Sequence, residues 1–460
     1  MLLAAAAIAA VDTDIALGPG SAVALSGPSV AVGLATVVVI TLMVQWARAG
    51  TPRPASSDRR LTNLGRLVLH LWPVIVLTTL YPLVSPRMEG HEVSGVPLTT
   101  FILMVAVTVP WISQAVCAPL YRVLQPIWED GGRVELQRGF WRYWPATFLV
   151  TLPLSGAFAV VLWFGLGWSR GAVGSYLALL VLNVVFSQVL VVTNISKSRS
   201  GWAAGWTAYS LPVVLIPTAW ILPPVCGIAV LAVSWTRVRF ERPHALALRP
   251  AVSDMVAGLL LGSVLWADKF LYFLHGDNDI EILTLFISLL PAVVAYNYYF
   301  VCLEPAMGEV TRGVRSTLEG APMRWLPYEC TSMGRFVSWS LASTALLGAA
   351  IALVLALVAG GTGMDQVQVA VVSMASWLMM MCTITCYKID YAGARRAPLG
   401  LSAAYLVACV VAFGLAPTGV QAYVWLGVAA SGVLVAALVQ CTRLWRRPQY
   451  SLFWKHAVRW

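Results

Sequence analysis

The stretch LLGAAIALVLALVA, residues 346–359, runs without a single charged or hydrogen-bonding side chain. In a bilayer core every backbone N–H and C=O must find a partner inside the protein, so a spanning segment is either an α-helix or a strand of a closed barrel. Barrel strands alternate apolar and polar residues, and this run does not. The stretch therefore predicts a membrane-spanning helix and an all-α fold class.

The composition of the whole chain agrees with this prediction. Of the 460 residues, 59% are hydrophobic and only 11% are charged, with a mean hydropathy of +0.78. Such a chain cannot present a water-soluble surface. At about 20 apolar residues per span, we predict spans at 23–46, 65–84, 97–119, 145–168, 172–194, 203–221, 223–240, 251–275, 280–303, 335–359, 367–387, 398–416 and 421–441.

The basic residues predict the orientation of these spans, because Lys and Arg accumulate in cytoplasmic loops. All but three of the 30 basic residues fall on one side of the predicted spans, the exceptions being Arg87, Arg170 and Lys269. We therefore predict a multi-pass protein of the cell (cytoplasmic) membrane, with its N-terminus outside and its C-terminus in the cytoplasm. The net charge of +10 reflects this topology. It does not indicate nucleic-acid binding, which needs a basic stripe interleaved with aromatic residues.

Loop lengths predict an internal repeat. A long cytoplasmic stretch followed by four closely connected helices occurs twice, which gives two blocks of six spans at 65–240 and 251–441. Equal orientation of the two blocks is typical of a parallel repeat, as in rocking transporters. The remaining parts are a non-spanning leader at 1–22, an extra helix at 23–46 and a basic cytoplasmic tail at 442–460. The segment 203–240 also fits a single broken element instead of two spans.

The helix predicted at 251–275 carries the candidate functional charges. A charged side chain at the centre of a spanning helix costs roughly 2.5 to 3.5 kcal/mol, so it is a functional candidate by default. Asp254, Asp268 and Tyr272 fall on one stripe of this helix, and Lys269 lies beside it. We predict that Asp268 and Lys269 face a cavity and contact the substrate or a coupling ion.

These charges also have structural explanations. Asp254 lies near the helix start, where the helix dipole favours a carboxylate. Lys269 can snorkel to the headgroups with Asp268 as its partner. Because adjacent side chains point about 100° apart, we expect that Asp268 and Lys269 do not form an ideal pair and that at least one has a partner on another helix.

The next predicted span adds a polar aromatic cluster that includes Tyr296 and Asn297. Hydroxylated rings suit stacking on sugars, and they equally suit the interfacial aromatic belt. The tryptophans near predicted helix ends, such as Trp202, are assigned to that belt. We therefore include Tyr296 and Asn297 among the candidate binding residues.

Other polar and small residues inside the spans are assigned to packing. Asn183, Gln188 and Gln114 are expected to form hydrogen bonds between helices first and ligand contacts second. Gly258 and Gly262 form a small-xxx-small pair, which is typical of close helix packing. The sequence contains no phosphate-binding loop, nucleophile elbow or metal-spaced histidine pair. We predict no catalytic residue, no cofactor and no metal, so the driving force must be a gradient or a partner that pushes the substrate.

Several stretches carry a resemblance to a known family. They are the segment WADKF at 266–270 with Tyr272 and Phe273, the helix 100–122 that continues into YRVL at 121–124, and the helix from LLP at 289–291 to Glu304. Together they resemble the PelG-like exopolysaccharide transporters, a branch of the multidrug/oligosaccharidyl-lipid/polysaccharide flippase superfamily. The resemblance implies two six-helix bundles, polysaccharide export and a cytosolic glycosyltransferase partner. The extra helix at 23–46 departs from that family.

The function predicted from these observations is a flippase that exports a polysaccharide or lipid-linked glycan through the membrane lipid, by alternating access between two bundles. One alternative is a membrane-embedded glycosyltransferase or polymerase, although such an enzyme ordinarily has a long outer loop and the longest one predicted here spans only 85–96. The other is an exporter of small molecules on the same fold. We predict that the chain is not an enzyme.

Overall fold

The computed structural model describes residues 84–233, 242–276, 282–308, 310, 326–360 and 364–446. In these ranges the chain is helical apart from short connections and one hairpin, in which β1 (Glu92–Val93) pairs antiparallel with β2 (Val96–Pro97). The all-α fold class is therefore confirmed. The predicted leader, the extra helix at 23–46 and most of the first core span and of the basic tail lie outside the described residues.

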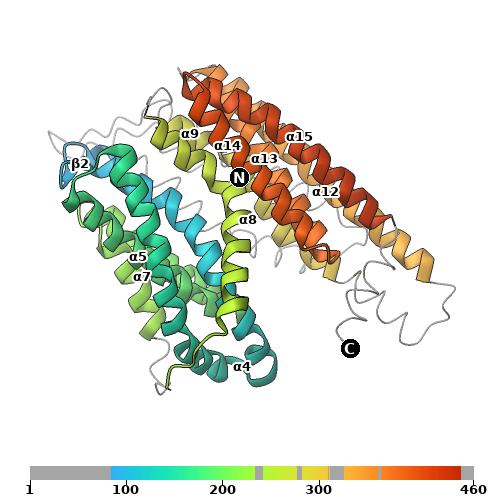
Figure 1. Cartoon of the computed structure of the whole chain (residues 1–460), viewed down its shortest axis with the longest axis horizontal. Coiled ribbons are helices and arrows are strands. Elements are labelled where there is room, and N and C mark those ends of the chain that lie inside the picture. Colours follow the sequence, from blue (N-terminus) through green and yellow to red (C-terminus); the bar gives the residue numbers. More distant parts are fainter. Residues whose placement is uncertain are drawn as a thin grey trace, which may run out of the picture. The chain divides into compact units, whose positions relative to one another are not determined.

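Figure 1 shows the helices of the described residues, several of which, such as α5, α8 and α14, lie close to predicted spans. Their bounds are α4 (Leu98–Leu166), α5 (Arg170–Ile195), α6 (Arg199–Leu215), α7 (Leu222–Val233), α8 (Leu248–His275), α9 (Ile282–Ser288), α10 (Leu290–Tyr298), η1 (Tyr299–Leu303), α12 (Leu326–Ala359), α13 (Gln366–Tyr391), α14 (Arg396–Leu415) and α15 (Gly419–Trp445). Within the described ranges, 7 helices are long and apolar enough to cross a membrane. The chain is a multi-pass α-helical membrane protein.

Helix α4 joins two predicted spans and the surface stretch between them. Its 69 residues would extend about 100 Å at 1.5 Å per residue, far more than the ~30 Å of a hydrocarbon core. The helical geometry is interrupted at Gly132, with φ 70° and ψ −160°. Glycine adopts this backbone conformation without a Cβ clash. The break therefore lies in the predicted cytoplasmic stretch, between the two membrane-crossing parts of α4.

Two other regions differ from simple spans. The span predicted at 280–303 consists of three consecutive pieces, α9, α10 and the π-helix η1. Pro291 lies at the start of α10, and its missing N–H and ring disfavour a continuous helix through that point. The segment 203–240, which fitted one or two elements, contains two helices, α6 and α7, that pack against each other.

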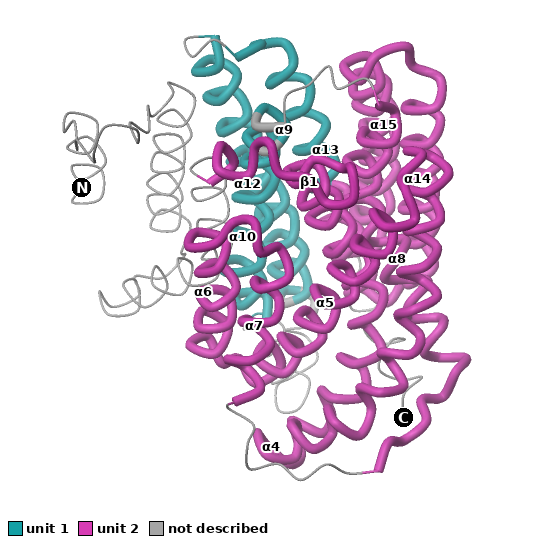
Figure 2. Tube along the Cα trace, turned by 90° about the vertical axis from the view of Figure 1, so that its left-hand side faces the viewer, with its two compact units in different colours: residues 1–83, 280–381, 446–449 teal, residues 84–279, 382–445, 450–460 magenta. Residues whose placement is uncertain are grey.

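The chain divides into two compact units (Figure 2). One unit includes the described residues within 280–381, and the other includes those within 84–279 and 382–445. In the first unit α10 packs on α12, and Trp377 Nε1 donates a hydrogen bond to Ala345 O over 3.0 Å. The predicted repeat of 65–240 and 251–441 stays a prediction.

Helix α8 packs against α4 and α14 in the second unit (Figure 1). A Cβ atom on Gly258 would lie 2.8 Å from Ala115 Cα, so the two helix backbones are in close approach at this glycine. The indole of Trp111 donates a hydrogen bond to Leu259 O over 2.9 Å, and its ring lies over Gly262. Close packing at the Gly258–Gly262 pair is confirmed.

Asn183 and Gln188 of α5 form the expected hydrogen bonds between helices. Gln188 accepts from Trp144 Nε1 over 2.9 Å and donates to Thr151 Oγ1 over 3.1 Å, both on α4. Tyr209 of α6 donates to Asn183 Oδ1 over 2.9 Å. These bonds hold α4, α5 and α6 together around the space described next.

Candidate functional site

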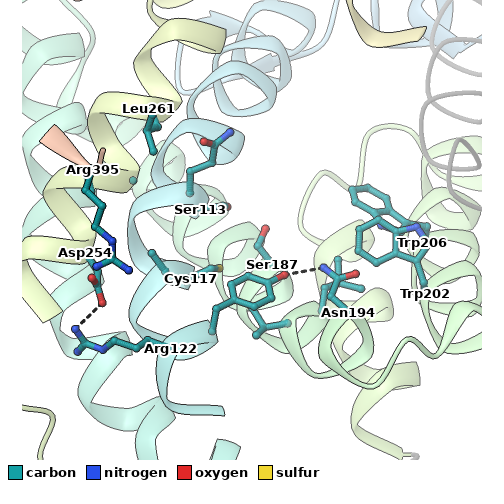
Figure 3. A pocket seen from close by; sticks show the side chains of 17 residues that line it. Ser113, Cys117, Arg122, Ser187, Asn194, Trp202, Trp206, Asp254, Leu261 and Arg395 are labelled. Carbon is teal, nitrogen blue, oxygen red and sulfur yellow. Dashed lines mark hydrogen bonds and ion pairs between the residues drawn. The ribbon is translucent and has the colours of Figure 1, made fainter. Parts of the chain in front are cut away.

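A cavity of about 630 Å³ lies inside the second unit. Four helices line it, namely α4, α5, α6 and α8, together with Arg395, which is the N-cap residue of α14. Figure 3 shows the side chains that surround it. Pockets of roughly 300–1,000 Å³ hold small ligands or a few sugar rings, so this cavity has the volume of a binding site.

Three charged residues line the cavity. Arg122 of α4 forms an ion pair with Asp254 of α8, with Nη1 and Oδ2 2.7 Å apart. The two side chains keep 38% and 28% of their surface exposed. Arg395 makes no ion pair with any residue in the part of the chain that the structure describes. In the view of Figure 3 it extends toward Asp254 from the side opposite Arg122.

The remaining lining is aromatic and polar. Trp202 and Trp206 of α6 lie with ring centroids 6.0 Å apart and planes at 60°. Asn194 Nδ2 donates to Tyr121 Oη over 2.9 Å. Trp206 Nε1 is buried without a hydrogen-bond partner among the described residues. Indole and phenol faces stack on sugar rings, while hydroxyl and amide groups bond to sugar hydroxyls, so this lining suits a polar, ring-shaped ligand.

Asp254 is the one predicted site residue that lines this cavity. Its neighbours Gly258 and Leu261, on the same stripe of α8, line it too. Gln114, which was assigned first to helix packing, is also part of the lining. The other predicted residues of this stripe, Asp268 and Tyr272, do not line the cavity.

Asp268 and Lys269 are each 1% exposed and are not among the residues that line the cavity. Lys269 Nζ lies 2.9 Å from both carboxylate oxygens of Asp268 and donates a hydrogen bond to Oδ1. It also donates to Leu265 O over 3.1 Å. The expectation that these neighbours do not form an ideal pair was wrong, because the flexible four-carbon stem of lysine turns the ammonium back along the helix to the adjacent carboxylate.

The surroundings of the Asp268–Lys269 pair come from α14 and α15. Tyr405 and Cys409 of α14 and Tyr423 of α15 are close enough to Asp268 to interact with its charge. Asp268 Oδ2 and Tyr423 Oη accept or donate no hydrogen bond within the described part of the chain. The pair is thus buried on α8 beside residues of α14 and α15, all within one unit.

Tyr272 lies one turn beyond this pair and is 5% exposed. Its ring is 6.0 Å from that of Tyr423 and 6.5 Å from that of Phe413, measured between centroids. A Cβ on Gly419 would lie 2.7 Å from the Tyr272 ring. The tyrosine therefore packs α8 against the neighbouring ends of α14 and α15, and the structure does not place it in the cavity.

Tyr296 and Asn297 belong to α10 in the other compact unit. Asn297 Nδ2 donates to Val293 O of its own helix over 2.7 Å. The Tyr296 ring lies 4.6 Å from that of Phe300. Their assignment to a binding site stays a prediction.

The cavity residues that were not predicted include Arg122, Asn194, Trp202, Trp206 and Arg395. The arginines were attributed to cytoplasmic loops, and tryptophans near helix ends to the aromatic belt. Both attributions describe average behaviour of these residue types. A single sequence holds no signal that these helix ends converge.

No protein family model matches the chain, and no curated protein does either. Among solved structures, the chain is similar to a crystal structure of MATE in complex with MaD3S, at 12% identity and a TM-score of 0.42, covering 92% of this chain and 97% of that one. It is also similar to the outward-facing conformation of a multidrug resistance MATE family transporter of the MOP superfamily, at 11% identity and a TM-score of 0.38, over 92% and 96% of the two chains. At these scores the likeness assigns no family.

Proposed function

We propose that this protein is a membrane transporter that moves a polysaccharide or lipid-linked glycan across the membrane, with the cavity of the second unit as its substrate-binding site. The observation that carries this function is the combination of a 630 Å³ space with an aromatic, amide and ion-paired lining inside a multi-pass helical protein. Arg122, Asn194 and Arg395 line the cavity at the helix ends that the distribution of basic residues predicts to be cytoplasmic. A substrate made in the cytoplasm would enter there.

The buried Asp268–Lys269 pair has a separate role in this proposal. A carboxylate and an ammonium enclosed within a spanning helix are costly and are retained for function in most membrane proteins. Because the pair does not line the cavity, we assign it to coupling, meaning that an ion or proton acts on the pair when the helices α8, α14 and α15 rearrange. Asp254 is assigned to the substrate site.

The proposal describes a transporter and not an enzyme, and it includes the cytosolic glycosyltransferase that the PelG-like resemblance implies as a partner. One alternative is favoured by a specific observation. A volume of 630 Å³ also suits a drug-sized molecule, so a small-molecule exporter would use the same cavity. The identity of the transported substrate distinguishes these two functions.

The test is to fill the cavity. Ser187 of α5 lines it, and its hydroxyl donates to Asn183 O of its own helix over 3.0 Å. In Ser187→Trp the indole would occupy the space that the substrate needs. Ala178→Trp on the exposed face of the same helix is the matched control. The assay is uptake into proteoliposomes of a fluorescent oligosaccharide, either free or on a polyprenyl carrier, beside ethidium as a small-molecule probe.

We expect the wild-type protein and Ala178→Trp to transport one of the glycan probes, and Ser187→Trp to lose that transport at an unchanged midpoint of thermal unfolding. Transport of ethidium alone would favour the small-molecule exporter. Full glycan transport by Ser187→Trp would exclude the cavity as the substrate path.

A further inference from the structure

The charges of the cavity do not balance. Its lining contains two guanidinium groups, Arg122 and Arg395, and one carboxylate, Asp254. Only Arg122 is paired with that carboxylate, at 2.7 Å, and Arg395 has no ion pair within the described ranges. The charged lining residues therefore sum to one surplus positive charge, which favours an anionic ligand over a neutral or cationic one.

The three charges also come from three different helices. Arg122 lies on α4, Asp254 on α8, and Arg395 precedes α14. Guanidinium groups bind phosphate and carboxylate oxygens with two parallel hydrogen bonds, and such charge-assisted bonds are about twice as strong as neutral ones. Trp202 and Trp206 line the same cavity, on the side away from the three charges in the view of Figure 3. The arrangement matches a sugar that carries an acidic group.

We infer that the substrate is an anionic glycan, whose phosphate or carboxylate group binds Arg395 and competes with Asp254 for Arg122 while a sugar ring contacts the tryptophans of α6. This substrate class presupposes the transport function proposed above. It excludes a neutral or cationic polysaccharide as the preferred cargo. It also gives Asp254 a defined role, since the carboxylate occupies Arg122 in the absence of substrate and is displaced when an acidic group arrives.

If Asp254 competes with the acidic group for Arg122, two substitutions in the cavity should change the affinity for that group in opposite directions. Arg395→Gln removes a ligand of the acidic group and should weaken its binding about tenfold or more, the effect of one charge-assisted hydrogen bond. Asp254→Asn removes the competing carboxylate and should strengthen that binding. A purely structural role of the Arg122–Asp254 pair would weaken binding in both variants. Arg396→Gln changes an exposed arginine outside the cavity lining and is the matched control.

The experiment measures binding to the full-length protein in detergent by microscale thermophoresis. The probes are trigalacturonic acid for a carboxylate, polyprenyl-diphosphate N-acetylglucosamine for a phosphate, and maltotriose as a neutral sugar. We expect one acidic probe to bind at least tenfold more tightly than maltotriose, and the better of the two identifies the acidic group. Arg395→Gln should remove that preference and leave maltotriose binding unchanged.

Each failure points to a different conclusion. Equal affinities for acidic and neutral probes, or an unchanged preference in Arg395→Gln, would overturn the anionic substrate and leave glycan transport standing. Weaker acidic binding in Asp254→Asn would overturn the competition. Absence of binding to all three sugars would contradict the glycan transporter itself.

Discussion

The two ends of helix α8 carry similar charges in opposite environments. At one end Asp254 is paired with Arg122 on another helix, and both side chains are about one-third exposed beside a cavity. At the other end Asp268 is paired with its neighbour Lys269, and both are 1% exposed. A carboxylate in contact with an open space can exchange partners with a ligand. One that is sealed between helices can respond only when the helices themselves move.

The largest effect is expected from breaking the sealed pair. Lys269→Met leaves Asp268 buried without its cation, and removal of one partner of a buried pair costs roughly 3 to 5 kcal/mol. Asp268→Asn should also destabilise the fold, since it strands the ammonium. The measurement is the midpoint of thermal unfolding in detergent, followed by fluorescence-detected size exclusion.

The double variant Asp268→Leu/Lys269→Met is the control for this prediction. Replacement of a buried ion pair by apolar residues is often neutral or stabilising, so the double variant should unfold near the wild-type temperature. Single variants as stable as the wild type would show that the pair is not enclosed as described.

A smaller effect is expected one turn from Asp254, where Gly258 brings α8 against α4. Gly258→Ala places a methyl group against the backbone of Gln114 and Ala115, and overpacking of this kind costs about 1 to 3 kcal/mol. Gly427→Ala in α15, where an added Cβ meets nothing within 4 Å, is the control and should not lower the unfolding midpoint. Equal behaviour of the two variants would argue against the close approach of α4 and α8.

The smallest loss of stability is expected at the open end. Arg122→Gln removes an ion pair that is partly exposed, and such pairs contribute about 1 kcal/mol or less. High salt screens exposed charges, so the small difference from the wild type should disappear in 1 M NaCl. A loss as large as that of Lys269→Met would mean that the cavity end is as sealed as the other.

Much of the fold follows from the sequence, because the physical cause is local. The bounds of α5, α8 and α14 lie within about three residues of the predicted spans, since about 20 consecutive apolar residues define a span wherever they occur. The division of 280–303 into three pieces was not predicted. Pro291 indicates a break but does not specify a π-helix after it.

The site was predictable only in part, since it depends on which helix ends meet. The charges of α8 were identified because a buried charge is costly regardless of its partners. Arg122 and Arg395 are 273 positions apart, and their convergence on Asp254 depends on packing that no local pattern encodes. The close Asp268–Lys269 pair was not expected, because Cα–Cβ directions alone do not account for the length of the lysine side chain.

The most direct test of the separate roles assigned to the two ends of α8 is the concentration dependence of transport into proteoliposomes. It is measured with the acidic probe that binds best. For Arg395→Gln we predict a half-saturating concentration raised about tenfold with an unchanged maximal rate. For Asp268→Leu/Lys269→Met we predict a strongly reduced maximal rate, with an unchanged half-saturating concentration for the transport that remains. Loss of the maximal rate in both variants, or a normal rate in the double variant, would contradict the assignment of substrate binding to one end of α8 and coupling to the other.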